Sequence, residues 1–139
     1  MKAKIYKSLP IEAKRIREEV FIKEQGFISE YDEIDDIATH IVVFDGNEPI
    51  ATCRVFESRD HESYTLGRLA VKKEYRGKGV GSGVVAEAER YVAGLGIKNM
   101  ILHSQLTAKG FYQRLGFSEY GEFEYEEDCP HIWMKKELS

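Results

Sequence analysis

Residues 66–82, LGRLAVKKEYRGKGVGS, contain the three local signals around which the rest of the chain is arranged. Residues 66–71 have strand length and are apolar apart from Arg68, which predicts a buried strand, and glycines follow at Gly77, Gly79 and Gly81. These glycines leave backbone N–H groups uncovered by side chains, and the free N–H groups of the helix that begins there point the same way. The stretch therefore predicts a strand, a turn and a helix start that together bind phosphate oxygens.

Two basic side chains support this interpretation, because Arg76 and Lys78 add charge at the positive end of the helix dipole. A surface turn that is rich in glycine for conformational reasons is the alternative. A Walker loop is excluded, since no GxxxxGK followed by Ser or Thr is present. A dinucleotide-binding loop is disfavoured as well, because the glycines are not spaced GxGxxG and the next strand ends at His103-Ser104-Gln105 without an acidic residue.

The spacing Arg76-x-x-Gly79-x-Gly81 resembles the R/Q-x-x-G-x-G/A signature of the GNAT superfamily of acyl-coenzyme A N-acyltransferases. Residues 108–117 (AKGFYQRLGF) resemble the A-x-x-F-Y-x-K-x-G-F helix of that family, with Arg114 in place of the lysine. Residues 20–25 (VFIKEQ) and 126–134 (EEDCPHIWM) resemble two segments of its ElaA-like branch, the second being one residue short at Cys129. Together the four segments span almost the whole chain.

This resemblance implies a single GNAT-like domain over residues 1–139, of the α/β (α+β) class. We expect a mixed, mostly antiparallel sheet that is splayed at its fourth strand, where Gly67 eases a bulge, with helices on both faces. The resemblance also implies acetyl-CoA as co-substrate, its pantetheine arm paired with the backbone of the central strand and its pyrophosphate held by the loop. The residues expected to bind it are Leu69, Ala70, Val71, Arg76, Gly77, Lys78, Gly79, Val80, Gly81 and Ser82.

The reaction implied is direct attack of a primary amine on the thioester in a ternary complex, and it needs an acid for the leaving thiolate and a base for the amine. The resemblance assigns the acid to Tyr112, which otherwise reads as a core residue in line with Ala108 and Leu115. Related enzymes that modify histones carry a glutamate base near the position of Thr65, which cannot accept a proton at neutral pH. The base therefore stays open, with these candidates besides a water chain: Glu24, His103 and Asp128.

Two acidic segments bear on the chemistry of the acceptor molecule. Residues 30–36 hold five acids, and residues 118–128 hold six, with Glu122, Glu124 and Glu126 on alternate positions of a predicted strand. Either segment is a solvated surface or borders a cleft that attracts a cationic amine. The acceptor is thus a small-molecule amine or a lysine side chain. A non-catalytic acyl-CoA binding or sensing module is the alternative function.

Composition further narrows the class of protein and the partners that it can have. A net charge of −4 argues against a nucleic-acid partner, and no apolar run is long enough for a signal sequence or a membrane span. Two cysteines, Cys53 and Cys129, lack metal-binding spacing, so we expect free thiols, no metal and a cytoplasmic protein. The sequence is compatible with a homodimer as well as with a monomer.

Periodicity predicts the element order β α β β β α β α β β. The first helix should be capped by Ser8, begin at Pro10 and stop at Gly26, with Ala13, Ile16 and Val20 on its buried face. Helices are also expected over 80–95, with Leu95 on the apolar face, and over 107–115. The strands are expected over 2–7, 40–44, 50–56, 66–71, 99–103, 117–125 and 131–136.

Overall fold

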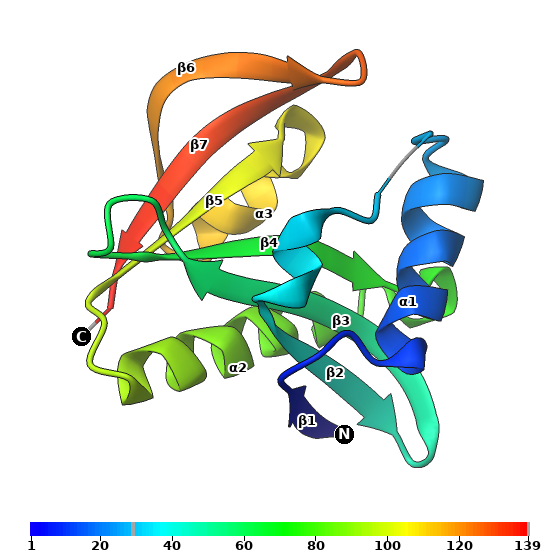
Figure 1. The fold of residues 1–139 in the computed structure, drawn as a ribbon. Coiled ribbons are helices and arrows are strands. Elements are labelled where there is room, and N and C mark those ends of the chain that lie inside the picture. Colours follow the sequence, from blue (N-terminus) through cyan, green and yellow to red (C-terminus); the bar gives the residue numbers. More distant parts are fainter. Residues whose placement is uncertain (29, 139) are drawn as a thin grey trace.

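A seven-stranded sheet in the order β1-β2-β3-β4-β5-β7-β6 forms the middle layer of the computed structural model (Figure 1). The structure describes residues 1–28 and 30–138, apart from the side chain of Phe123. The strands are β1 (Lys2–Tyr6), β2 (Thr39–Asp45), β3 (Glu48–Glu57), β4 (Tyr64–Val71), β5 (Asn99–Gln105), β6 (Ser118–Glu126) and β7 (Cys129–Glu137). The α-helices are α1 (Ile11–Arg17), α2 (Val80–Gly94) and α3 (Lys109–Arg114). Short helical segments are η1 (Glu18–Glu24), η2 (Glu33–Asp36), η3 (Lys73–Tyr75) and η4 (Leu106–Ala108).

The order of strands and α-helices is the predicted one. Strands β4 and β5 pair parallel, and the other neighbouring pairs are antiparallel. The predicted mixed, mostly antiparallel sheet is thus confirmed.

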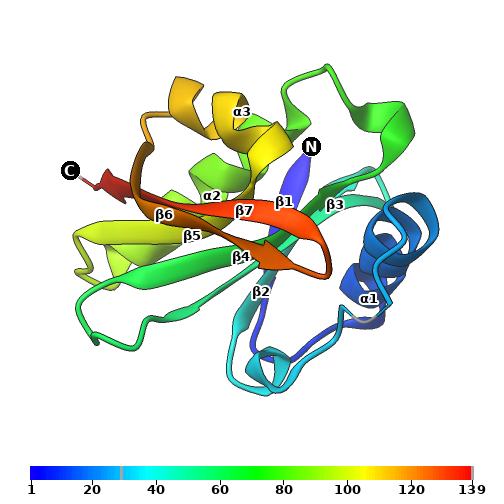
Figure 2. The same cartoon turned by 90° about the horizontal axis from the view of Figure 1, so that it is seen from above.

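Helices cover both faces of the sheet, as Figure 2 shows from above, and each face has its own apolar core. Alternation along β3 directs Cys53 and Val55 toward α2, which contributes Val84 and Ala88 to that core. On the opposite face, Ala13, Ile16, Val20 and Phe21 of α1 and η1 pack on Val42, Phe44 and Ala70. The predicted buried face of the first helix is therefore confirmed.

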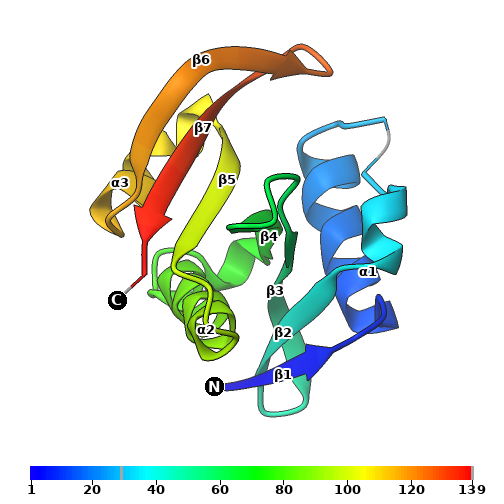
Figure 3. The ribbon, with the colours of Figure 1, turned by 60° about the vertical axis from the view of Figure 1, so that its left-hand side comes forward.

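Strands β4 and β5 separate partway along their length. Their parallel pairing covers Tyr64–Met100, Thr65–Ile101 and Leu66–Leu102 and goes no further. Beyond that point α1, η1 and β1–β4 lie on one side of a fork, and β5, β7 and β6 on the other (Figure 3). The splay expected at the fourth strand is confirmed, and it leaves one edge of β4 without a neighbouring strand.

A bulge accompanies the splay, since Thr52 pairs with Ala70 whereas Arg54 pairs with Gly67. The residue with left-handed backbone is Arg68, at φ 52°, and not the expected Gly67. Because a β-carbon added at Gly67 would meet Arg54 at 3.6 Å, an ordinary contact distance, the bulge does not depend on that glycine.

Two local predictions were wrong. Pro10, not Ser8, is the N-cap of α1, and no side chain caps that helix, because proline carries no side-chain hydrogen-bond acceptor. Leu95, predicted on the apolar face of the helix, follows the end of α2 and is 48% exposed. Val85 of that helix was not predicted on this face and is buried. Within residues 1–28 and 30–138, no helix is both long and apolar enough to cross a bilayer.

Candidate active site

Two adjoining cavities follow the open edge of β4. The first, of about 400 Å³, lies at the fork of β4 and β5, and we call it the fork cavity. The second, of about 530 Å³, lies at the glycine loop before α2, and we call it the loop cavity. They adjoin along β4, because both are lined by Gln25, Leu69, Ala108 and Phe111.

The loop cavity gathers nine of the ten residues expected to bind acetyl-CoA, namely Leu69, Ala70, Val71, Arg76, Gly77, Gly79, Val80, Gly81 and Ser82. The tenth, Lys78, does not line it, and its Nζ atom lies 5.8 Å from the centre of the Tyr75 ring.

Glycine is required at two positions of this loop. Gly79, the N-cap of α2, has φ 80°, which a side chain would strain. A β-carbon on Gly81 would lie 3.3 Å from Cζ of Phe111, so its absence lets the first turn of α2 approach α3. Since no side chain caps this N-terminus, its backbone N–H groups face the cavity as donors for an anion.

Arg76 holds the loop in place through three contacts. Its Nε atom donates to the Val71 carbonyl at 2.9 Å, and its two terminal nitrogens donate to both carboxylate oxygens of Glu24 at 2.6 and 2.7 Å. The hydrogen bonds from Arg76 hold the pKa of Glu24 below its usual value. This candidate base therefore serves as the partner of the loop arginine, which makes it a poor proton acceptor.

Tyr112 lies in the wall of the fork cavity, on the face of α3 that also faces the core. Its ring makes edge contacts with Phe111 and Phe117, at centroid distances of 5.0 and 5.8 Å. Burial raises the pKa of Tyr112, so the phenol stays protonated at neutral pH. Tyr112 therefore belongs to the apolar core and also lines the fork cavity.

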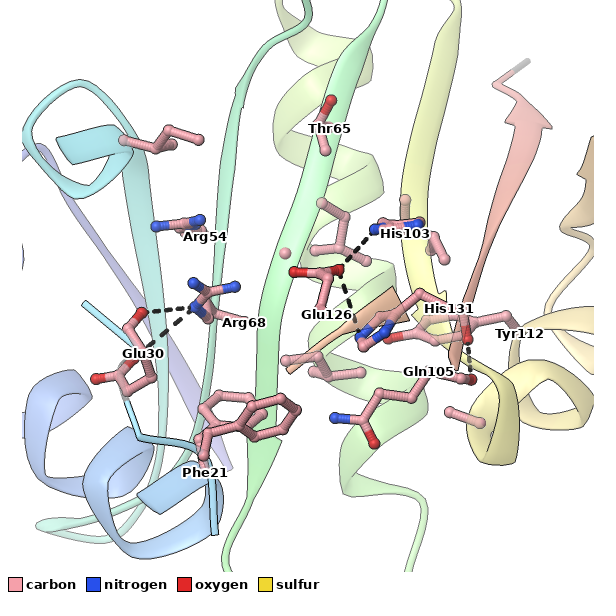
Figure 4. A pocket seen from close by; sticks show the side chains of 18 of the residues that line it. Phe21, Glu30, Arg54, Thr65, Arg68, His103, Gln105, Tyr112, Glu126 and His131 are labelled. Atoms are coloured by element: carbon pink, nitrogen blue, oxygen red, sulfur yellow. Dashed lines mark hydrogen bonds and ion pairs between the residues drawn. The ribbon is translucent and has the colours of Figure 1, made fainter. Parts of the chain in front are cut away.

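A carboxylate between two histidines lies on the same side of the fork cavity as Tyr112, across from Arg54 and Arg68 (Figure 4). Oε2 of Glu126 lies 2.6 Å from Nδ1 of His103 and 3.5 Å from Nε2 of His131. The His103 ring stacks on Trp133 at 4.5 Å, and Nδ1 of His131 donates to the Cys129 carbonyl at 2.9 Å. Of the three base candidates, His103 is the one that belongs to this cluster.

Asp128, the third candidate, is exposed in the β6–β7 turn and lines neither cavity. Glu126 was not among the residues predicted as the base. No local sequence signal indicates it, because only the register of β5, β7 and β6 brings His103, His131 and Glu126 together.

The first acidic segment is largely buried by arginines from distant parts of the chain. Arg17 of α1 contacts Glu30 at 2.7 Å and both oxygens of Asp35 at 2.8 Å, and all three side chains are buried. Burial alone would raise the pKa of Asp35, but the hydrogen bonds and charges of Arg17 and Arg54 outweigh it and hold this pKa far below its usual value. The solvated-surface alternative is therefore wrong for Glu30 and Asp35.

Two further arginines extend the network into the fork cavity. Arg54 of β3 donates to Asp32 at 2.6 Å and to Asp35 at 2.9 Å. Arg68, at the bulge of β4, donates to the Glu30 carbonyl at 2.8 Å and to Asp32 at 3.3 Å. The positive charges on this wall are thus matched by carboxylates.

The acids of the second acidic segment, residues 118–128, differ in whether they line the fork cavity. Glu126 and Glu127 line the fork cavity, whereas Glu122 and Glu124 are exposed and do not. Oε1 of Glu127 accepts a hydrogen bond from the backbone N–H of Ile28 at 2.9 Å, which joins the β6–β7 turn to the segment after η1. Because the arginines are already paired, Glu126 and Glu127 give the cavity an excess of negative charge.

Comparison with known proteins agrees with this geometry. The sequence matches the acetyltransferase (GNAT) family model over residues 6–117. It is 37% identical over 134 residues to the uncharacterized protein YyaT of Bacillus subtilis (strain 168), covering 92% of this chain and 88% of that protein. It is 36% identical over 126 residues to the uncharacterized N-acetyltransferase YjcF of the same organism, covering 88% of each. The crystal structure of Escherichia coli ElaA is similar with a TM-score of 0.85 and 27% identity, covering 97% of this chain and 98% of that one.

Proposed function

The chain belongs to the acetyltransferase (GNAT) family, and from this premise we propose that it transfers an acetyl group from acetyl-CoA to a primary amine by direct attack in a ternary complex. The observation that carries the proposal is the cleft along the open edge of β4, which runs from the N-terminus of α2 to Tyr112 at the fork. We take residues 1–139 as the catalytic domain. The free thiols of Cys53 and Cys129 support a reducing compartment such as the cytoplasm.

Acetyl-CoA fits the loop cavity by its chemistry. Its pyrophosphate needs donors, and the uncapped N–H groups from Gly77 to Ser82 supply them. Its pantetheine arm needs backbone partners, and Leu69, Ala70 and Val71 lie on the strand edge that has no neighbour. Arg76 keeps the loop in its place through Val71 and Glu24. The thioester then lies at the junction of the two cavities.

Tyr112 is the acid of the proposed reaction. As the amine forms its bond to the acetyl carbon, the carbon–sulfur bond breaks and its electrons stay on sulfur. Burial raises the pKa of Tyr112, so the phenol is protonated at neutral pH, and it can pass that proton to the thiolate only when it is held against the sulfur. Phe111, shared by both cavities, walls the passage between them.

The acceptor is a cationic amine, a small molecule or a lysine side chain. The excess negative charge of Glu126 and Glu127 attracts it, while Phe21, Phe27 and Trp133 provide apolar lining for its carbon skeleton. A neutral or anionic acceptor would leave these carboxylates without a counter-charge.

The test is release of CoA thiol from acetyl-CoA in the presence of spermidine, benzylamine or Nα-acetyllysine, with mass spectrometry of the amine. Amine-dependent release with an acetylated product supports the enzyme. Binding of acetyl-CoA without turnover of any of these amines would instead favour the alternative, a non-catalytic acyl-CoA binding module.

A further inference from the structure

Among the described residues that line the fork cavity, Glu126 is the carboxylate that lies between two imidazoles and still presents an oxygen to the cavity. We propose that Glu126 binds the attacking ammonium group and accepts a proton from the amine as it attacks, and that His103 positions this carboxylate. The proposal rests on the proposed function and names the base that the sequence left open.

The three side chains come from three adjacent strands. His103 directly follows Leu102, the last residue of β5 that pairs with β4, so it lies where the strands begin to separate. It pairs with Trp133 of β7, and His131, two residues before Trp133, projects from the same face. Glu126 ends β6 opposite Cys129. Because these positions are set by the sheet, the cluster has the rigid support that a catalytic group needs.

The carboxylate is oriented by its contacts. Oε2 faces both histidines, and Figure 4 shows the other oxygen pointing into the cavity, away from them. The side chain of Glu126 is 44% exposed, which leaves room for an approaching amine. His103 is itself fixed by stacking on Trp133, so the 2.6 Å contact does not depend on a mobile side chain.

Hydrogen-bond chemistry fixes the donor at Nδ1 of each ring. Oε2 can only accept, so Nδ1 of His103 is the donor in that contact. The Cys129 carbonyl can likewise only accept, so Nδ1 of a neutral His131 carries the proton and its Nε2 is an acceptor facing Glu126. His103 thus stabilises the charged carboxylate, whereas a neutral His131 makes no hydrogen bond to it.

The other acids near the cleft are already engaged. Glu24 is bound to Arg76, and Asp32 is bound to Arg54 and Arg68. Glu30 is buried against Arg17. Glu127 accepts a hydrogen bond from the backbone N–H of Ile28. Thr65, at the position of the glutamate base in related enzymes, is not an acid, and its hydroxyl lies 2.7 Å from that of Ser58.

The protons balance over one turnover. The ammonium ion loses one proton to solvent before attack, and Glu126 receives the second as the carbon–nitrogen bond forms. Tyr112 gives its proton to the thiolate as the carbon–sulfur bond breaks. The proton on Glu126 then leaves to solvent, which reaches this half-exposed carboxylate directly, and Tyr112 regains one from solvent. One proton is released in net, and both side chains return to their starting forms.

The test compares Glu126→Gln with Glu122→Gln, which removes the same charge from an exposed position of the same strand. Spermidine, benzylamine and Nα-acetyllysine are titrated calorimetrically into the CoA-loaded proteins, and turnover of acetyl-CoA with each amine is measured. We expect Glu126→Gln to weaken binding of the amines that bind wild type by about tenfold or more, and to lower kcat by about 100-fold or more, at an unchanged acetyl-CoA Kd. Glu122→Gln should match wild type.

Equal amine affinity in Glu126→Gln and wild type, or no amine binding by wild type, would overturn the proposal, because Glu126 would then not be the ammonium site. Failure of the proposed function gives a different pattern: wild type and Glu122→Gln would bind an amine more tightly than Glu126→Gln, yet neither would release thiol. In that case Glu126 keeps its assignment as the ammonium site and loses that of base.

The positioning role of His103 has its own readout. Asparagine can replace Nδ1–H as a donor to Glu126, whereas alanine cannot. We expect His103→Asn to retain kcat within about tenfold, and His103→Ala to lose about 100-fold, with equal acetyl-CoA affinity in both. Equal losses in the two variants would show that His103 acts in some other way.

Discussion

Arg76 and Glu24, which lie 52 residues apart, form an ion pair in which both carboxylate oxygens accept hydrogen bonds from one guanidinium, at 2.6 and 2.7 Å. The pair joins η1 to the glycine loop and so connects the layer of α1 with the start of α2. Motif spacing suggested Arg76 for the pyrophosphate, and Glu24 was one of three candidate bases. The geometry gives both a common structural task beside the loop cavity.

We predict that Glu24→Gln leaves kcat within about threefold of wild type, because a half-exposed ion pair contributes little and the hydrogen bonds of Arg76 lower the pKa of this carboxylate. Steady-state kinetics with acetyl-CoA and the best amine substrate provide the measurement. A 100-fold fall in kcat at unchanged acetyl-CoA affinity would instead identify Glu24 as the base.

Removing the Tyr112 hydroxyl should affect chemistry and not binding. Tyr112→Phe keeps the edge contacts with Phe111 and Phe117, so the fold and the acetyl-CoA Kd should stay unchanged, while kcat falls by about 100-fold. Tyr120→Phe, on β6 and outside both cavities, is the matched control. Equal rates for Tyr112→Phe and wild type would remove the phenol from the mechanism.

Asp35 should be a major contributor to stability. It accepts hydrogen bonds from Arg17 and Arg54 in a buried site, so Asp35→Asn leaves two guanidinium groups without their shared carboxylate. We expect the free energy of unfolding to fall by about 3–5 kcal/mol, measured by urea denaturation. Asp36→Asn, at the exposed neighbouring position, should change it by less than about 0.5 kcal/mol.

The same carboxylate should shape the acid limb of the stability curve. Its pKa is lower in the folded protein than in the unfolded chain, so its contribution is complete above the unfolded value of about 3.9 and is lost as pH falls below it toward the folded value. Wild type should therefore lose stability more steeply than Asp35→Asn as pH falls from about 4 to about 2. Parallel curves would contradict this assignment.

Local patterns were enough to predict the order of elements. Alternation and helical spacing are properties of neighbouring residues, so the strands, the α2 core face and the glycine loop could all be located from the sequence. Helix ends were less certain: the extended entry at Pro10 replaced the expected Ser8 cap, and Leu95 fell just beyond α2.

Charge pairing over long distances could not be predicted in this way. The acids of residues 30–36 have no basic neighbour in sequence, and their partners Arg17, Arg54 and Arg68 come from α1, β3 and β4. Glu126 was likewise seen as one acid on an anionic strand. Only the register of β5, β7 and β6 brings it against His103 and His131, and a register depends on the packing of the whole sheet.

Calorimetric titration of wild type and Ser82→Glu with acetyl-CoA, CoA, ATP and NAD tests the central claim most directly. The new carboxylate would lie in the first turn of α2, where it suits the helix dipole but repels a pyrophosphate at the N–H groups of the loop. Ser8→Glu, at an exposed position outside both cavities, is the control. We predict that wild type and Ser8→Glu bind the two CoA species with Kd of order micromolar and bind ATP and NAD far more weakly, and that Ser82→Glu loses about tenfold or more in CoA affinity. Absence of CoA binding by wild type, or equal affinity in Ser82→Glu, would contradict the account.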